Sequence, residues 1–365
     1  MQIVHGEASY HLATPELDLD VTSRGGHLGP VVFHLPGRDV SPYSLSPWQP
    51  EEFPEIPALL SVLRGDFLCL PFGGQADGPP HGEVANSTWT KADSDEGSLR
   101  FVMVTTDTGA SVEKIVSTRK GEHAVYQEHR ISGLEGEYNY GSHPILDLSG
   151  LPDGAGRVSV SPFRWASVFP GAFSNPADGE TQALMEGARF SDLREVPLAT
   201  GGTTDLTRYP ARRGNDDLVM MVSEAATEEQ PFAWSAVVFH GYVWFSLKNP
   251  ADFPATLFWL SNGGRTAAPW NGRHCGRLGI EEVCSYFANG VAVSRRAPLA
   301  DEGIPTSRRF HLGETVSLRT IQAVALVGGD FGKVVEIVPA GDGVVTIFGE
   351  SGAQVTVAVD WRFLL

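Results

Sequence analysis

The stretch that decides the fold is Val237–Phe245, VVFHGYVWF, in which two runs of β-branched and aromatic residues flank the pair His240-Gly241. Valine, tyrosine, tryptophan and phenylalanine favour strands, and a two-residue connection that contains glycine is typical of a tight hairpin turn. The sequence therefore predicts an antiparallel β-hairpin that reverses at His240-Gly241.

Short runs of the same character recur along the whole chain, and 41 glycines and 25 prolines supply turn residues between them. This pattern, without long amphipathic helices, predicts an all-β fold: a large antiparallel β-sandwich with few short helices. Short helical turns are placed only at Gln182–Glu186 and Glu282–Ala288. The expected strands are Leu17–Val21, Pro30–Leu35, Leu99–Thr105, Ser111–Thr118, Ala124–Ile131, Leu218–Ser223, Ala233–Phe239, Tyr242–Leu247, Thr256–Leu260, Ser317–Ala325, Val344–Phe348 and Gln354–Val359.

No linker and no internal repeat divides the chain, so we expect residues 1–365 to form one domain. Residues 328–365 carry another hairpin pattern and are expected to add C-terminal strands to the same sheets. Three segments read as loops: Pro42–Pro57, Gly74–Pro80 and the long Phe173–Arg213. Long loops of this kind often form the rim or lid of a site, although many have no functional role.

The formal net charge of −17 argues against nucleic acid and anionic membranes as partners. No apolar run approaches the length of a membrane-spanning helix, and Met1–Gly6 lacks the features of a secretory signal. The three cysteines, Cys69, Cys275 and Cys284, have no CxxC spacing and are expected to be buried free thiols. A cytoplasmic location follows as an expectation, and the oligomeric state is left open.

The segment Arg277–Glu281 presents a candidate base. Strand alternation places Leu278 and Ile280 on the core face and Gly279 and Glu281 on the opposite face. Because glycine leaves space beside it, the Glu281 carboxylate is positioned to accept a proton from a hydroxyl group. The alternative is an ordinary exposed glutamate at the end of a strand.

Two histidines and an arginine offer donors for hydroxyl oxygens. His143 shares a strand face with Asp147 and is a candidate proton donor near neutral pH, or else a structural histidine. His81 is presented by a loop of prolines and glycine, and Arg64 opens an apolar strand. His81 is either a ligand-binding residue or a loop histidine, and Arg64 either reaches a ligand oxygen or caps the edge of a sheet.

Aromatic and cationic side chains precede Glu281 in the sequence. Trp259, Trp270, Arg273 and His274 form this group. Aromatic rings beside polar donors suit a carbohydrate, which has apolar C–H faces and hydroxyl edges. Trp259 is expected in the core, whereas Trp270, in a Pro/Asn/Gly loop, is the better candidate for stacking against a sugar.

Other chemistries find little support in the sequence. The chain has no phosphate-binding P-loop, no GxSxG nucleophile elbow, no HExxH and no EF-hand pattern. The spacing of His5, His11, His27 and His34 matches no zinc template. We therefore expect neither a metal nor another cofactor.

Several of these segments, in this order, resemble the aldose 1-epimerase (galactose mutarotase-like) family and its hexose-6-phosphate epimerase branch. The resemblance rests on motifs spread over most of the chain: Arg64-Gly65 with Pro71-Phe72-Gly73, His81-Gly82 with Trp89, Ser142-His143-Pro144, Gly279-Ile280-Glu281 and Leu312-Gly313-Glu314. It implies the family's β-sandwich, termed a supersandwich, and an isomerase of carbohydrate metabolism that needs no cofactor.

The resemblance also implies roles for individual residues. Glu281 would be the general base that takes the proton of the sugar C1 hydroxyl, and His143 the general acid that protonates the ring oxygen. Arg64 and His81 would hold ring oxygens. An aspartate that steadies the sugar would be Asp205 or Asp217; no motif picks between them, and Asp205 is named as the candidate. We expect Glu281 and His143 to face one concave pocket with His81, where Trp270 and Arg273 also contact a monosaccharide.

Two departures from the family pattern bear on the substrate. Asp66 replaces the second glycine after Arg64, and Asn86 stands where the hexose-phosphate branch has a phosphate-binding arginine. A neutral sugar is therefore favoured over a phosphorylated one. Two alternatives remain: a carbohydrate-binding or regulatory protein that keeps the cleft without turnover, and a lyase or glycosidase module on the same scaffold.

Overall fold

The computed structural model describes residues 1–365 and consists mainly of antiparallel strands with a few short helices. No helix combines the length and the apolar character needed to cross a lipid bilayer. The chain divides into two compact units: unit 1 with Met1–Pro144, Asp252–Pro254 and Glu282–Ile321, and unit 2 with Ile145–Ala251, Ala255–Glu281 and Gln322–Leu365. The expectation of a single domain stays a prediction.

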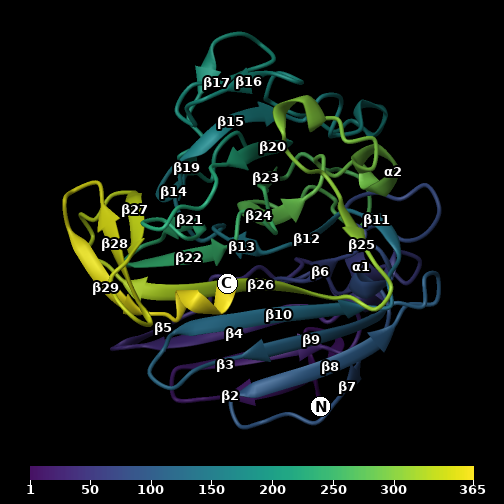
Figure 1. The fold of residues 1–365 in the computed structure, drawn as a ribbon. Coiled ribbons are helices and arrows are strands. Elements are labelled where there is room, and N and C mark those ends of the chain that lie inside the picture. Colours follow the sequence, from purple (N-terminus) through teal and green to yellow (C-terminus); the bar gives the residue numbers. More distant parts are fainter. The chain divides into compact units, whose positions relative to one another are not determined.

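Unit 1 contains two main antiparallel sheets, drawn in purple and blue in Figure 1. One has the order β1-β2-β3-β4-β5, and the other includes β10-β9-β8-β7. The strands are β1 (Gln2–Val4), β2 (Glu7–Ala13), β3 (Leu17–Thr22), β4 (Leu28–Leu35), β5 (Arg38–Val40), β7 (Thr90–Lys91), β8 (Ser98–Val104), β9 (Ser111–Ser117) and β10 (Ala124–Ser132).

The two sheets of unit 1 pack through alternate side chains. On β8, Leu99 and Phe101 are buried while Arg100 between them is exposed. The Phe101 ring meets the Tyr10 ring of β2 edge to face, with 5.4 Å between ring centroids. This is the period-2 pattern of a sandwich in which one face of each sheet is covered.

Smaller elements complete unit 1. β12 pairs with β6, and β11 pairs with β25. Two strands, β24 and β26, have residues in both units. The bounds are β6 (Leu68–Cys69), β11 (Gly136–Tyr138), β12 (Tyr140–Ser142), β24 (Arg277–Cys284), β25 (Arg308–Phe310), β26 (Thr315–Leu326), η1 (Pro50–Glu52), α1 (Ala58–Ser61), η2 (Glu83–Ala85), α2 (Gly290–Ser294) and η4 (Ala300–Glu302).

Unit 2 is also built of antiparallel sheets. One part has the order β19-β14-β21-β22, and another β16-β15-β20-β23-β24 with β13 paired to β24. The bounds are β13 (Ile145–Asp147), β14 (Gly156–Val160), β15 (Phe163–Val168), β16 (Arg189–Phe190), β17 (Val196–Pro197), β18 (Thr203–Thr204), β19 (Arg208–Tyr209), β20 (Asn215–Ser223), β21 (Ala233–Val238), β22 (Tyr242–Lys248), β23 (Ala255–Asn262), η3 (Pro176–Asp178) and η5 (Trp361–Leu364). The three-stranded sheet of β27 (Val334–Pro339), β28 (Val344–Gly349) and β29 (Gln354–Ala358) is yellow in Figure 1.

The central strands of unit 2 are buried on both faces. Every residue of β21, β22 and β23 is buried, so these strands do not show the alternation of a half-covered sheet. Tyr209 of β19 links the two sheets, because its hydroxyl donates to the carbonyl oxygens of Ser261 on β23 and Arg277 on β24, each at 2.9 Å. The core of unit 2 therefore lies between these two layers.

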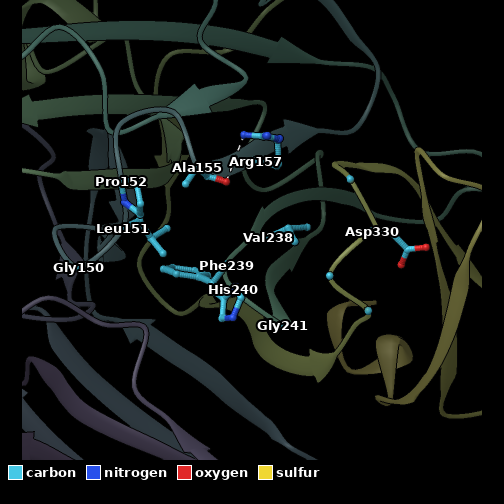
Figure 2. A pocket seen from close by; sticks show the side chains of 13 residues that line it. Gly150, Leu151, Pro152, Ala155, Arg157, Val238, Phe239, His240, Gly241 and Asp330 are labelled. Carbon is cyan, nitrogen blue, oxygen red and sulfur yellow. Dashed lines mark hydrogen bonds between the residues drawn. The ribbon is translucent and has the colours of Figure 1, made fainter.

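The hairpin prediction is confirmed. β21 pairs antiparallel with β22, and the Phe239 N–H donates to the Tyr242 carbonyl at 2.8 Å across the turn. Gly241 adopts a φ of 83°, a left-handed conformation that glycine reaches without strain. Figure 2 shows Phe239, His240 and Gly241 at this turn.

The other strand positions also hold, whereas both helical turns are wrong. The strands of residues 328–365 pair only with one another, in the sheet β27-β28-β29, so the expectation that they extend the same sheets is wrong. Each expected run coincides with a strand of the structure. Gln182–Glu186 forms no helix, and Glu282–Cys284 ends β24. The loop-like Phe173–Arg213 contains η3 and the short strands β16, β17, β18 and β19. All three cysteines are free; Cys69 and Cys284 are buried and Cys275 is partly exposed.

Candidate functional site

Glu281 lies in the middle of β24 and is buried, with 3% of its surface exposed. Alternation alone predicted that it points away from the core, but both faces of β24 are covered. A Cβ atom at Gly279 would lie 2.9 Å from Glu281 Oε1 and 3.0 Å from Trp259 Cβ, so the carboxyl group lies where glycine leaves room. Burial raises the pKa of Glu281 to about 8, against the opposing effect of the Arg265 guanidinium.

Arg265 is surrounded by three aromatic rings of unit 2. Its guanidinium carbon lies 5.1 Å from the ring centre of Phe173, 5.3 Å from that of Trp259 and 5.0 Å from that of Trp270. Its Nε lies 3.9 Å from Asp216 Oδ2, and the guanidinium donates no hydrogen bond within the protein. Cation–π contacts hold the group in place, so its N–H groups are preorganised for a ligand oxygen.

Asp216 is a second buried carboxyl group beside Arg265. It is 1% exposed, and burial raises its pKa to about 7 while the Arg265 charge opposes the shift. Its neighbour Asp217 accepts hydrogen bonds from the backbone N–H groups of Ala183 at 3.0 Å and Leu184 at 2.9 Å. Asp217 thus fixes a loop, whereas Asp216 and Glu281 are two buried carboxyl groups that interact with one guanidinium.

Trp270 belongs to the same aromatic cluster. Its ring meets Trp259 at 5.7 Å and His274 at 5.1 Å between centroids, both edge to face. Trp270 is 7% exposed, so most of its surface is covered within the cluster and it is not an open stacking platform. Burial lowers the pKa of His274 well below its usual value, and its Nδ1 lies 2.7 Å from the Ser261 hydroxyl oxygen.

Arg273 and Asp205, two predicted sugar-binding residues, have none of the contacts with Arg265 that define the aromatic cluster. Arg273 is exposed, and its backbone N–H donates to the Trp270 carbonyl at 2.8 Å. Asp205 lies in a local turn, where its carboxylate accepts from the Thr207 N–H at 2.7 Å and the Thr207 hydroxyl at 2.6 Å. These hydrogen bonds show that the Asp205 side chain stabilises its own turn. Its role in binding a sugar stays a prediction.

His143 and His81 lie side by side in unit 1. Their ring centroids are 5.2 Å apart, with the planes nearly perpendicular at 76°. The His143 ring stacks on the Phe67 ring, with 4.7 Å between ring centroids. The Phe67 ring also stacks on the His27 ring, at 4.2 Å. His81 holds a left-handed backbone with φ of 61°, and its Nδ1 accepts from the Gly73 N–H at 3.3 Å. The loop therefore presents the His81 ring to His143.

A chain of buried polar groups holds the backbone of His143. Asp66 Oδ1 accepts from the His143 N–H at 2.8 Å and from the Ser142 hydroxyl at 2.8 Å. Gln127 donates to Asp66 Oδ2 and accepts from Lys114 Nζ at 3.1 Å. Burial lowers the pKa of Lys114 to about 8 while the charge of Asp66 raises it. The aspartate that departs from the family pattern thus anchors the histidine.

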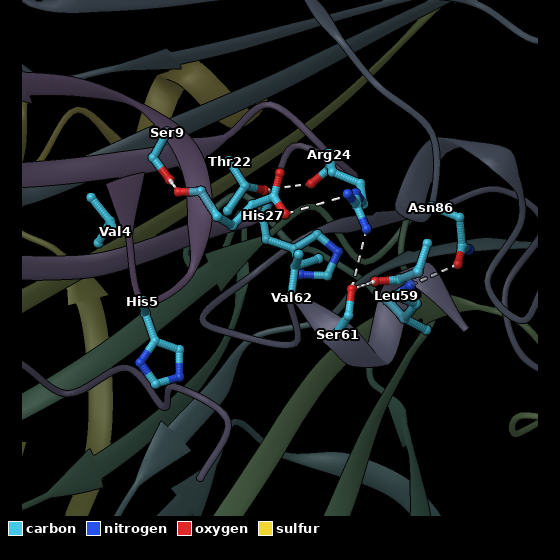
Figure 3. A network of polar contacts seen from close by, with 12 residues as sticks. Val4, His5, Ser9, Thr22, Arg24, His27, Leu59, Ser61, Val62 and Asn86 are labelled. Atoms are coloured by element: carbon cyan, nitrogen blue, oxygen red, sulfur yellow. Dashed lines mark hydrogen bonds and ion pairs between the residues drawn. The ribbon is translucent and has the colours of Figure 1, made fainter. Parts of the chain in front are cut away.

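Arg64 is fully buried and donates only to backbone carbonyls in the contacts observed. Its Nε, Nη1 and Nη2 donate to Val62 O at 2.9 Å, Val4 O at 2.8 Å and His5 O at 3.0 Å. Figure 3 shows these three acceptor residues among the neighbouring polar contacts. These contacts favour a structural role for Arg64, the alternative to reaching a ligand oxygen. A role in ligand binding stays a prediction.

Each unit therefore brings together part of the predicted set. Unit 1 holds His143 beside His81, and unit 2 holds Glu281 and Trp270 around Arg265. That Glu281 and His143 face one pocket stays a prediction. Sequence reasoning missed Arg265, although it follows a Gly-Gly pair after a buried strand, and it considered Asp217 rather than its neighbour Asp216. No three or more His, Cys, Asp or Glu side chains gather as a metal site would require.

Comparison with solved structures identifies the fold. A "putative aldose 1-epimerase" of Escherichia coli K12 superposes with a TM-score of 0.60 at 13% identity, covering 88% of this chain and 100% of that one. A galactose mutarotase-related enzyme of Lactobacillus acidophilus gives 0.56 at 11% identity, covering 87% and 97%. A galactose mutarotase-like protein of Lactobacillus casei ATCC 334 gives 0.56 at 13% identity, covering 87% and 100%.

No protein-family model matches the sequence, and no curated protein matches it either. The resemblance that the motifs indicated is thus confirmed by three-dimensional similarity. The chain has the mutarotase-like β-sandwich fold, a fold associated with carbohydrates in these neighbours.

Proposed function

We propose that this protein is an aldose 1-epimerase-like isomerase that interconverts the anomers of a sugar. The observation that carries the proposal is Glu281: a carboxyl group buried over Gly279, with its pKa raised to about 8, beside a cluster of arginine and tryptophan. A base with a pKa near the working pH transfers protons efficiently, because it is both basic enough and partly ionised. The fold shared with mutarotase-like proteins supports the same reaction class.

In the proposed reaction, Glu281 takes the proton of the C1 hydroxyl while His143 protonates the ring oxygen. The C1–O5 bond breaks, C1 becomes an aldehyde, and rotation about C1–C2 exposes its other face. Closure of the ring then returns both protons and gives the opposite anomer. The reaction is redox-neutral, and each group recovers its starting protonation state after the return step.

The residues around Glu281 have parts in this scheme. The Arg265 guanidinium, held among three aromatic rings, favours the ionised form of Glu281 and is a donor for a sugar oxygen. The small exposed parts of Trp270 and Trp259 are proposed to supply apolar surface for C–H groups. In unit 1, His81 lies against the His143 ring at 5.2 Å and is proposed to bind a hydroxyl group.

The proposed substrate is a neutral sugar. Asn86, which stands where the hexose-phosphate branch has arginine, is buried, and its amide serves the protein itself. It accepts from the Leu59 N–H at 2.9 Å and donates to the Pro80 and Gly82 carbonyls at 2.8 Å each. Figure 3 shows Asn86 beside Leu59. Nothing in this arrangement offers a cation to a phosphate group.

Anomer exchange measured by NMR on a panel of aldoses tests the proposal. Wild-type protein is expected to accelerate exchange, and Glu281→Gln or His143→Ala to reduce the rate by roughly 10²–10⁴-fold. Because two groups that act in one step are not additive, the double variant should be no slower than about the worse single variant. Asp342→Asn, an exposed change in the β27–β28 turn, serves as the matched control.

Two results would overturn the proposal. Exchange at the uncatalysed rate with every sugar that binds would instead identify a carbohydrate-binding or regulatory protein. Acceleration that survives both Glu281→Gln and His143→Ala would remove these two residues from the mechanism.

A further inference from the structure

Unit 2 contains a cavity that shares no residue with the Glu281 cluster. Its volume is about 550 Å³, within the range of small-molecule sites. Figure 2 shows its lining side chains. They come from the connection between β13 and β14 with the start of β14, the end of β21 with the β21–β22 turn, and the segment between β26 and β27.

Backbone hydrogen bonds within unit 2 hold these three connections. The Val327 N–H donates to the Gly241 carbonyl at 3.1 Å, which ties the segment after β26 to the hairpin turn. The Gly154 N–H donates to the Pro210 carbonyl at 2.7 Å, and the Phe331 N–H donates to the Gly328 carbonyl at 3.1 Å. The cavity is therefore formed by a fixed backbone before any ligand arrives.

One wall of the cavity is aromatic. Phe239 lines it and stacks on Tyr242 with 4.7 Å between ring centroids and only 3° between planes. This stacking fixes the orientation of the Phe239 ring. Phe239 is 8% exposed, so a small part of this fixed ring reaches the cavity, where it offers apolar contact to the C–H groups of a sugar with little loss of conformational entropy.

Two opposite charges lie on the other walls, and they are not paired with each other. Arg157 Nη1 donates to the Gly154 and Ala155 carbonyls, which leaves the other guanidinium donors without a protein acceptor. Asp330 is exposed and makes no hydrogen bond or ion pair in the structure. The backbone N–H groups of Gly328 and Gly329 likewise donate to no protein acceptor.

We propose that this cavity is a second carbohydrate site, which binds a neutral mono- or disaccharide. A polyol supplies acceptors for the Arg157 and glycine N–H donors, donors for the Asp330 carboxylate, and a C–H face for Phe239. An anion would meet the Asp330 carboxylate in a chain of net charge −17, and an apolar ligand would desolvate that carboxylate and the remaining Arg157 donors without supplying partners. The inference goes beyond the proposed isomerase reaction and does not depend on it.

Binding of methyl glycosides to the full chain tests this site. Methyl β-glucoside, methyl β-galactoside and methyl β-maltoside have no free anomeric hydroxyl, so they cannot be epimerised and report binding alone. Affinity is measured by ligand-observed NMR titration. At least one glycoside is expected to bind to wild type, and Asp330→Asn and Arg157→Gln are each expected to weaken that binding roughly tenfold or more.

Controls separate this cavity from the proposed isomerase site. Asp342→Asn repeats the Asp330→Asn change at another exposed position of unit 2, and binding should be unchanged. Glu281→Gln should reduce anomer exchange by roughly 10²–10⁴-fold while leaving glycoside binding at the second site. Asp330 is an exposed loop residue, so its variant is expected to fold; thermal unfolding followed by circular dichroism checks this for every variant.

Three outcomes would overturn the proposal. The first is no binding of any of the three glycosides to wild type. The second is binding that survives both Asp330→Asn and Arg157→Gln, or that disappears only in Glu281→Gln, which would place the sugar elsewhere. The third is tighter binding of glucuronate or inorganic phosphate than of the neutral glycosides, which would assign the cavity to anions.

Discussion

Glu281 and Asp216 are two carboxyl groups whose protonation depends on burial and on one arginine. Burial favours the neutral form of each group, and Arg265 favours the charged form. The balance leaves both pKa values near neutral pH, where proton transfer to and from a sugar hydroxyl is most useful. Small changes in this environment are therefore expected to change activity.

The rate of anomer exchange should follow the ionisation of Glu281. Because the pKa of Glu281 is raised to about 8, only about one tenth of it is ionised at pH 7. In the wild type the loss of the proton from His143 opposes this rise, so the profile is followed in His143→Ala, whose residual kcat/KM we expect to rise as the pH increases from about 6 and to level off above about 8. Exchange NMR across this range checks the profile, with Glu281→Gln at each pH as the background. A rate that falls over the same interval would contradict the role of Glu281 as base.

The same residue should affect stability in a pH-dependent way. Folded Glu281 keeps its proton up to about pH 8, whereas the unfolded chain releases it near the ordinary pKa of 4.5. Between these values the folded state binds more protons, so its free energy of unfolding falls as pH rises. Glu281→Gln cannot ionise and should gain roughly 2–4 kcal/mol relative to wild type between about pH 5 and pH 8. Urea unfolding at both pH values measures this, and a constant difference would exclude the shift.

At the scale of the strand, β24 depends on the missing side chain of Gly279. A Cβ atom there would lie 2.9 Å from Glu281 Oε1 and 3.0 Å from Trp259 Cβ. We expect Gly279→Ala to displace the carboxyl group, lower exchange at least tenfold and cost about 1–3 kcal/mol of stability. The matched control is Gly74→Ala, because its Cβ would meet nothing within 4 Å. The exchange rate and the free energy of unfolding in urea are measured for both variants. Equal values for the two would show that Gly279 is not needed to make room for the Glu281 carboxyl group.

The buried chain that links β9 and β10 to His143 makes a further prediction. Gln127→Leu removes the group that joins Lys114 to Asp66, leaving two buried polar groups short of a partner. We expect a loss of roughly 2–3 kcal/mol, measured by urea unfolding, and a slower exchange rate. Gln354→Leu, exposed on β29, should change stability by less than about 0.5 kcal/mol. Lost stability with an unchanged exchange rate would mean that the chain only supports the fold.

Strands could be predicted from sequence better than the site could. Runs such as Ser111–Thr118 and Val344–Phe348 show their strand character locally, by alternation and β-branched residues. The burial of Glu281 is not visible locally, because it results from cover on both faces of β24. Arg265 was missed for the same reason, since the rings of Phe173, Trp259 and Trp270 come from separate parts of the sequence.

At the scale of the whole molecule, charge should select among sugars. The chain has 44 acidic and 27 basic residues besides histidine, giving −17, and Asn86 is committed to backbone contacts. We expect kcat/KM for neutral aldoses to exceed that for their 6-phosphates. Raising the salt concentration to about 0.2 M should accelerate only the phosphorylated sugars, because salt screens repulsion. Exchange NMR at low and high salt measures both, and faster turnover of a phosphate ester at low salt would contradict this expectation.

The three free thiols differ in their access to reagents. Cys69 and Cys284 are buried, and burial raises the pKa of Cys284 to about 12, so its reactive thiolate is scarce. Cys275 is partly exposed, and it follows His274, whose ring contacts Trp270. A maleimide dye added to the unaltered native protein should therefore attach at Cys275 alone. Its fluorescence would report changes in the surroundings of the Trp270 indole without an engineered label.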